Sequence, residues 1–383
     1  MRARRSRPVL AAVAATLAVA CGGCTVPVAG SVAAADALAW AAFPAPPTTR
    51  LGPRPLQAVL DALVATGRTY PTATTGTPGV TAAVITAAGT WTGAAGVDGR
   101  GTPLRASSRL GIGDLTMTVT AAELLRLAEQ DQLDLDARVS TLVPGGPDAT
   151  VRQVLGMRSG LPDLTDAQYT ALAAAAAADP GRRWTVVDAQ ALAPAGAPVA
   201  VPTYDALGYA WLGVLVERLT GLPYDRAVER DLLASASLTD PSTDGPAVAP
   251  GPDGRGPDGR STPPALAATV GATGLIADAG STARWGWELY GARILRPESV
   301  AAMTTPAGPG RVANRPYGLG TMIFSATIAP QESFGHLGRV PGYTALLVVA
   351  PWARMSVAVL AIGGGKELAD AGRALFLAAG LPG

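Results

Sequence analysis

The chain has 383 residues and a formal net charge of +1, a length typical of one large domain or two closely packed ones. Near-neutral charge, with few basic runs beyond the N-terminus, argues against nucleic-acid binding. Apolar residues make up 48% of the chain but aromatic residues only 5%, and Lys366 is the only lysine. The single lysine limits the catalytic schemes open to this protein.

Residues 1–24 have the features of an export signal. Four arginines within residues 2–7 precede an apolar run at 9–20, which is too short for an ordinary transmembrane span. Cys21 and Cys24 each follow a small residue, which resembles a bacterial lipobox. We expect lipidation at Cys21 or Cys24 and a location on the outer face of the cytoplasmic membrane. The alternative is an ordinary signal peptide and a secreted protein.

Both cysteines of the chain lie in this N-terminal segment. The rest of the chain therefore has neither a disulfide nor a thiol nucleophile. Residues 25–53 are rich in Ala and Pro, as a linker is expected to be.

Apolar periodicity and turn residues predict the elements of the remaining chain, 54–383. We expect helices at 56–67, 115–130, 171–178, 209–219, 281–290 and 367–379. We expect strands at 80–85, 90–95 and 317–323, and further strands from Phe334 onward, with 343–350 and 355–362 as an antiparallel hairpin.

Strands at both ends with helices between them predict an α/β (α+β) fold. It would hold a mixed antiparallel sheet flanked by helices, with a helical subdomain inserted in the middle. The sheet subdomain would span about 54–115 and 268–383, and the helical subdomain about 116–267. Residues 241–264 are rich in Gly and Pro and predict a flexible surface loop, which is either a spacer or a lid.

The segment Arg109–Met117 has the pattern of a strand that runs into the N-terminus of a buried helix. Asp114 is expected to cap that helix, where the helix dipole favours a negative charge by about 0.3–1 kcal/mol. The alternative is that Asp114 acts as a carboxylate nucleophile or a base.

From about Leu56 to Ala379 the sequence resembles the serine β-lactamase superfamily, in its class C and D-alanyl-D-alanine carboxypeptidase branch. The segments that carry the resemblance are 78–79, 109–113, 133–136, 150–155, 159–162, 274–277, 317–320 and 334–343. The last, Phe-Gly-His-Leu-Gly-Arg-Val-Pro-Gly-Tyr, is the most specific. The resemblance implies a β-lactamase/DD-peptidase-like fold.

The resemblance also implies a Ser-x-x-Lys motif, in which the serine attacks an acyl carbon and the lysine helps take its proton. At this position the chain has Asp114-Leu115-Thr116-Met117. No other Ser-x-x-Lys exists, because the residue three positions before Lys366 is Gly363. The usual mechanism of the family is therefore excluded.

Two further motifs of the family are partly kept. Tyr-x-Asn aligns with Tyr204-Asp205-Ala206, so the tyrosine that shuttles protons in active relatives is present and the amide that orients the substrate is lost. The His-x-Gly motif of the strand beside the cleft is present as His336-Leu337-Gly338. The family active-site positions are thus Asp114, Met117, Tyr204, Ala206, His336 and Gly338.

Other hydrolytic schemes find little support. The chain has no Gly-x-Ser-x-Gly motif, and His336 is the only histidine available for a triad or a zinc site, so no metal or cofactor is expected. We expect His336 to be a structural residue of the cleft. A pair between Asp114 and His336 would raise the pKa of the imidazole by attraction of opposite charges.

Three hypotheses remain. The first is a non-catalytic envelope lipoprotein that binds a cell-wall peptide, another small ligand or a protein partner in a vestigial cleft. The second is an active esterase, amidase or carboxypeptidase with non-standard residues around Asp114, Tyr204 and His336. The third is a purely structural envelope protein. No residue pattern indicates the oligomeric state.

Overall fold

A computed structural model describes residues 43–65, 79–179, 182, 184–193, 199–233, 268–324, 328–340, 342–363 and 367–380. Cys21, Cys24, Lys366 and the loop expected at 241–264 lie outside these residues. Within the described ranges, no helix is both long enough and apolar enough to cross a membrane.

The centre of the molecule is a six-stranded sheet in the order β2-β1-β8-β7-β6-β5, and all neighbouring strands are antiparallel. Its strands are β1 (Val80–Thr86), β2 (Gly89–Ala95), β5 (Met322–Phe324), β6 (Ser333–Val340), β7 (Tyr343–Ala350) and β8 (Met355–Ile362). The N-terminal hairpin β1-β2 joins the C-terminal strands through the β1–β8 pairing. This confirms the prediction of one sheet built from the N-terminal and the C-terminal strands.

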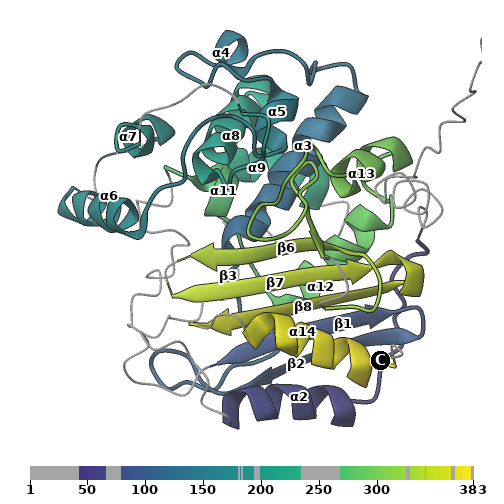
Figure 1. Ribbon diagram of the computed structural model, residues 1–383. Coiled ribbons are helices and arrows are strands. Elements are labelled where there is room, and N and C mark those ends of the chain that lie inside the picture. The colour runs from purple at the N-terminus through teal and green to yellow at the C-terminus, as the bar shows by residue number, and fades with distance from the viewer. Residues whose placement is uncertain are drawn as a thin grey trace, which may run out of the picture.

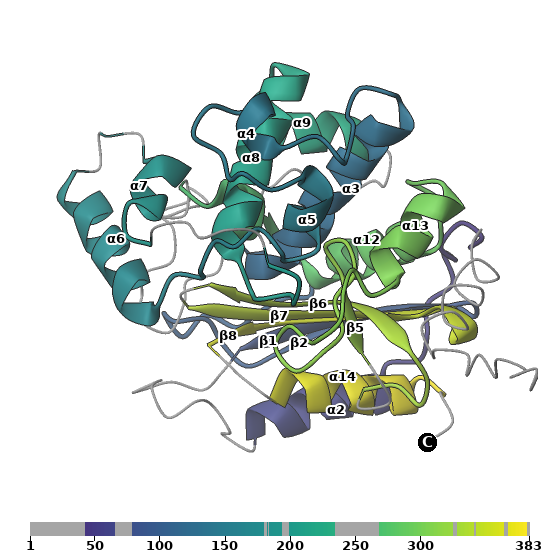
Figure 2. The ribbon, with the colours of Figure 1, turned by 45° about the horizontal axis from the view of Figure 1, so that its top comes forward.

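Helices cover both faces of this sheet (Figure 2). Helices α2 (Arg54–Ala65) and α14 (Glu367–Ala378) lie on one face, and α12 (Ala279–Tyr290) lies on the other. Every residue of β1 and of β8 is consequently buried. This explains why both strands are largely continuous apolar sequence rather than an alternation of apolar and polar residues.

Part of the segment expected to be a linker packs on this core. Phe43 is buried, with its ring edge-on to Trp287 at a centroid distance of 4.8 Å, and Arg50 forms a β-bridge with Thr90.

The helical region lies on the β6 side of the sheet (Figure 1). Its members are α3 (Thr116–Glu129), α4 (Val139–Leu142), α5 (Val151–Leu155), α6 (Asp166–Ala178), α7 (Val186–Gln190), α8 (Ala206–Thr220), α9 (Tyr224–Val228) and α11 (Val270–Thr273). Helix α13 (Pro297–Thr304) follows α12, and the short turn η3 (Pro351–Ala353) joins β7 to β8. The predicted helices and the terminal hairpins are therefore confirmed to within a few residues, apart from the start of α6.

The strand expected at 317–323 is largely wrong. Only Met322–Phe324 pairs with β6, because Gly318 N–H donates to the Thr321 carbonyl and closes a turn. Gly320 has a φ of +72°, which leaves the extended region and favours glycine.

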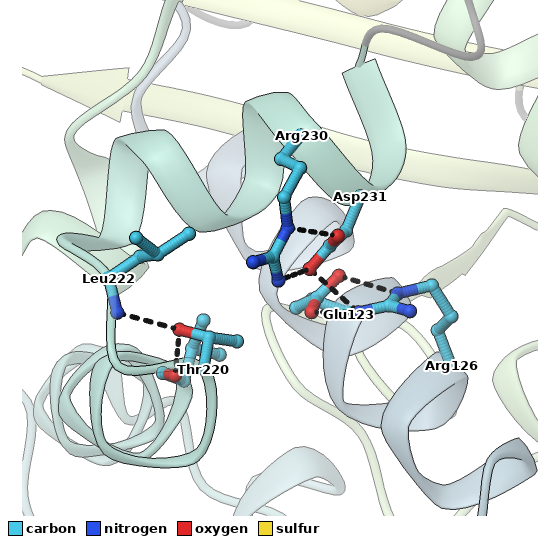
Figure 3. Close-up of polar contacts among 7 residues, drawn as sticks. Glu123, Arg126, Thr220, Leu222, Arg230 and Asp231 are labelled. Carbon is cyan, nitrogen blue, oxygen red and sulfur yellow. Dashed lines mark hydrogen bonds and ion pairs between the residues drawn. The ribbon is translucent and has the colours of Figure 1, made fainter.

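An ion-pair network joins α3 to the π-helical turn η2 (Glu229–Leu233), as Figure 3 shows. Arg126 Nη2 lies 2.7 Å from Glu123 Oε1 and 2.8 Å from Asp231 Oδ2, and Asp231 also pairs with Arg230 at 2.6 Å. The Glu123 side chain is fully buried, and burial raises its pKa while the hydrogen bond from Arg126 lowers it. Arg126 therefore compensates a carboxylate that has no access to water.

Candidate active-site cleft

Asp114 lies inside a 3₁₀ turn, η1 (Gly113–Leu115), between the short strand β3 (Leu110–Gly111) and α3. β3 pairs with β4 (Ile276–Ala277), which anchors the entry to the turn. The expected helix cap is wrong, because the N-cap of α3 is Leu115 and has no side-chain cap hydrogen bond. Asp114 Oδ2 instead accepts the backbone N–H of Arg339 on β6, at 3.0 Å.

Two glycines allow η1 to lie directly against β6. A Cβ atom on Gly113, whose φ is +53°, would lie 2.6 Å from backbone atoms of Arg339. A Cβ atom on Gly338 would lie 1.9 Å from the carbonyl oxygen of Ile112. Real Cβ contacts do not become this short, so the predicted site residue Gly338 acts through the absence of a side chain.

Tyr204 approaches Asp114 from the segment before α8. Its hydroxyl lies 4.0 Å from Met117 Sδ, and its interaction with the Asp114 carboxyl lowers the pKa of that carboxyl. Burial raises the pKa of Tyr204 well above its usual value, with a further contribution from the Asp114 charge. The Tyr204 hydroxyl is therefore a protonated donor and not a base.

The carboxyl of Asp114 has an unusual acidity. Burial raises its pKa to about 7, against the lowering effect of hydrogen bonds from Tyr204 and from the Arg339 N–H. The nearby charge of Asp163 raises the pKa further. Asp114 is therefore divided between its ionised and protonated forms near neutral pH.

Met117 occupies the position of the family's lysine and is fully buried. Its sulfur lies 4.0 Å from the hydroxyl of Tyr204 and 4.0 Å from that of Tyr317. A thioether is only a weak acceptor and carries no proton to exchange. Met117 therefore cannot act as a base between the hydroxyls of Tyr204 and Tyr317.

Ala206 and Asp205 stand where the family has the last two residues of Tyr-x-Asn. Ala206 is the buried first residue of α8 and offers only a methyl group. Asp205 is the N-cap of α8, where its Oδ1 accepts the Gly208 N–H at 2.7 Å. Its other oxygen hydrogen-bonds the hydroxyl of Ser159, and burial raises its pKa to about 7.

His336 is buried, and its ring contacts Tyr317 and the Leu337 carbonyl rather than Asp114. Its Nδ1 faces the Leu337 carbonyl, which can only accept, so Nδ1 carries the proton. Its Nε2 then accepts from the Tyr317 hydroxyl at 3.0 Å. Burial lowers the pKa of His336 to about 4, so the alternative of a pair with Asp114 that raises this pKa does not hold.

The structure thus brings Asp114, Met117 and Tyr204 together and connects His336 to them through Tyr317. Sequence reasoning missed Tyr317 and the Arg339 N–H, whose roles come from contacts distant in sequence. It also missed Asp205, although an Asp directly before an apolar helix is an N-cap signal. Among the described residues, no group of three or more His, Cys, Asp or Glu side chains is placed to hold a metal ion.

Comparison with known proteins identifies the family and the fold. A family model described as Beta-lactamase matches residues 56–380. A D-stereospecific amidohydrolase from Streptomyces sp. is 25% identical, with a TM-score of 0.63, over 82% of this chain and 95% of that one.

Two further solved structures share the fold. A D-amino acid amidase from Ochrobactrum anthropi SV3, complexed with L-phenylalanine, has a TM-score of 0.69 at 20% identity over 85% of this chain and 97% of that one. An octameric penicillin-binding protein homologue from Pyrococcus abyssi has a TM-score of 0.67 at 21% identity over 85% of this chain and 77% of that one. These matches confirm the superfamily and the fold that the motifs predicted. The chain belongs to the β-lactamase family.

Proposed function

We propose that this protein is a non-catalytic member of its family that binds a small ligand in the cleft around Asp114 and Tyr204. One observation carries the proposal. The buried thioether of Met117 occupies the position from which a base would activate a nucleophile, between the hydroxyls of Tyr204 and Tyr317.

The remaining polar groups do not replace the missing pair. Acyl transfer needs a nucleophile with a base within hydrogen-bond reach. Ser159 is buried and bound to Asp205, and His336 is neutral with its free nitrogen occupied by Tyr317. The serine–lysine scheme of the family therefore has no counterpart at this position.

The candidate ligand is a peptide or amide that contains a D-amino acid, such as a cell-wall peptide. Similar structures are named as a D-stereospecific amidohydrolase and a D-amino acid amidase, which supports this class of ligand. Another small molecule or a protein partner is the alternative ligand, and in each case the protein would bind the ligand without converting it.

We further propose that the protein is exported and anchored to the outer face of the membrane by a lipid on Cys21 or Cys24. The basic and apolar runs of residues 1–20 support this proposal. Mass spectrometry of the membrane fraction tests it. Loss of the lipid mass in one of Cys21→Ala and Cys24→Ala identifies the residue, and an unmodified N-terminus in the medium contradicts it.

Acylation by a fluorescent penicillin, with ester turnover measured in parallel, tests the absence of catalysis. We expect no labelling of the wild type and labelling of Asp114→Ser/Met117→Lys. Binding is tested by titration calorimetry of a peptide ending in D-Ala-D-Ala against the matched L-Ala-L-Ala peptide. A wild type that binds neither peptide and is not labelled would remove this ligand class.

A second candidate function is an altered hydrolase in which Asp114 is the working group. The pKa of about 7 favours this candidate, because a general base works best near the ambient pH. Turnover by the wild type that disappears in Asp114→Asn and declines as the pH falls below about 7 would establish it and remove the non-catalytic proposal.

A further inference from the structure

A small pocket lies between α3, α12, β4 and η2, apart from the cleft around Asp114. Its wall consists mainly of apolar side chains, among them Ile112, Leu115, Val119, Leu275, Ile276 and Trp285. These side chains leave a space of about 390 Å³, part of which is open to solvent. The family active-site positions, all of which the structure describes, do not belong to this wall.

The period of the helix places this pocket across α3 from the cleft. Leu115 and Val119 are four residues apart, which brings them to one face, whereas Met117 lies about 200° around the helix from Leu115. Met117 Sδ lies 4.0 Å from the hydroxyls of Tyr204 and Tyr317, on the side of the cleft. The pocket is therefore a second site and not an extension of the cleft.

The polar side chains of the pocket wall already donate their protons within the chain. Ser281 Oγ donates to Asp278 Oδ2 at 2.7 Å, and Thr282 Oγ1 donates to the Asp278 carbonyl at 2.8 Å. The indole N–H of Trp285 donates to Thr118 Oγ1 at 2.9 Å. A polar ligand would lose its hydrogen bonds to water and receive no proton from these groups, whereas an apolar ligand has none to lose.

We propose that this pocket binds a small apolar molecule of the size of one aromatic ring. The size follows from the volume, because part of the 390 Å³ is open to solvent and the enclosed part suits a single ring. Removal of apolar surface from water favours binding, as it does in cavities lined by Leu, Ile and Phe that take up benzene. The proposal does not depend on the function proposed above.

A ligand in this pocket would also contact the turn that carries Asp114. Ile112 and Leu115 belong to the pocket wall, and they flank the two residues Gly113 and Asp114 in the chain. The ligand would therefore touch η1 from the side that faces away from the cleft.

The experiment is a titration of the full chain with benzene, followed by the ¹H–¹⁵N signals of the tryptophan side chains. The chain has seven tryptophans, and the signal that disappears in Trp285→Phe belongs to Trp285. Bound benzene should shift this signal through its ring current. Trp211 and Trp352, assigned in the same way, are the internal controls, because their indoles donate to Gln190 and to the Glu332 carbonyl outside the pocket.

Two comparisons test the lining of the pocket. Ala277→Leu adds volume at the pocket wall and should weaken benzene binding by at least about tenfold, a loss that a few buried methyl groups can cause. Ala95→Leu is the matched control, since it makes the same change at another half-buried alanine that does not line the pocket. Phenol should bind about tenfold more weakly than benzene, because its hydroxyl leaves water without gaining a partner.

The proposal is overturned if benzene leaves the Trp285 signal of the wild type unchanged, or if it shifts the control signals equally. Undiminished binding by folded Ala277→Leu also overturns it. Where Ala277→Leu does not fold, the wild type decides, because equal affinities for benzene and phenol contradict an apolar site. Failure of the function proposed above is distinguishable, since the D-Ala-D-Ala peptide would then not bind while benzene still shifts the Trp285 signal.

Discussion

Asp205, in the second family motif, caps a helix and is buried. Its carboxyl caps α8 and holds the hydroxyl of Ser159, so it joins the helix to the segment that follows α5. Tyr204 comes directly before this cap, so the capped start of α8 holds the backbone from which its side chain extends. The second family motif is thus kept as a support for Tyr204.

We predict that Asp205→Ala lowers the free energy of unfolding by about 1–2 kcal/mol, because it removes the cap of α8. Asp205→Asn is the matched variant, since asparagine also caps helices and should cost less. Urea denaturation at pH 7 measures both. Equal losses for the two variants would show that the cap is not what Asp205 contributes.

Gly338 controls the contact between β6 and η1. We predict that Gly338→Ala destabilises the protein by about 1–3 kcal/mol, the usual cost of inserting a methyl group into a packed site. The added Cβ meets the Ile112 carbonyl, so the Arg339 N–H should also move away from Asp114. Gly52→Ala is the control, because a Cβ there meets nothing within 4 Å. A Gly338→Ala protein as stable as this control would contradict the packing argument.

At the scale of elements, the Glu123–Arg126–Asp231 network joins α3 to η2. Arg126→Met leaves the buried Glu123 without its partner, and we predict a loss of about 3 kcal/mol in the free energy of unfolding. Arg152→Met removes the exposed pair with Asp136 and should cost about 0–1 kcal/mol. Thermal and urea denaturation of the two variants give the comparison, and similar losses would refute a special role for the buried network.

The elements were predictable where their signals are local. The hairpin β1-β2 and helices such as α12 follow from alternation, turn residues and apolar periodicity within a dozen residues. The strand expected at 317–323 failed because the Gly318–Thr321 turn breaks the extended backbone. The residue types of segment 317–323 favour a strand, and they do not reveal that the backbone turns there.

The site was predictable only in part, for a physical reason. Motif positions identified Asp114, Met117 and Tyr204 as neighbours. The partner of Asp114 lies 225 residues away, so a reading of local sequence favoured the helix cap instead. The pKa of His336 depends on its complete burial, which is set by the packing of the whole sheet.

At the scale of the whole molecule, buried ionisable groups determine how stability changes with pH. Asp114 and Asp205 have pKa values of about 7 in the folded protein, above the unfolded value of 3.8, so the folded state binds more protons between these limits. These two groups therefore add stability as the pH falls from about 7 towards 4. Burial also raises the pKa of Glu123, which acts in the same direction.

His336 acts in the opposite direction, because its folded pKa of about 4 lies below the unfolded value of 6.5. The unfolded chain takes up this proton first, so His336 removes stability as the pH falls from about 6.5 to 4. Each group contributes a slope of at most about 1.4 kcal/mol per pH unit, and two carboxyls outweigh one imidazole. We predict that the free energy of unfolding is larger at pH 5.5 than at pH 7.5 in urea denaturation.

The variants separate these opposing contributions. Asp114→Asn/Asp205→Asn should remove the contribution of these two carboxyls, so the gain in stability between pH 7.5 and pH 5.5 should shrink while the opposing His336 effect stays. Arg152→Met, a surface change, should keep the wild-type profile. A wild type that loses stability as the pH falls through this range would mean that these carboxyls are ionised in the folded protein, and that burial does not hold their protons.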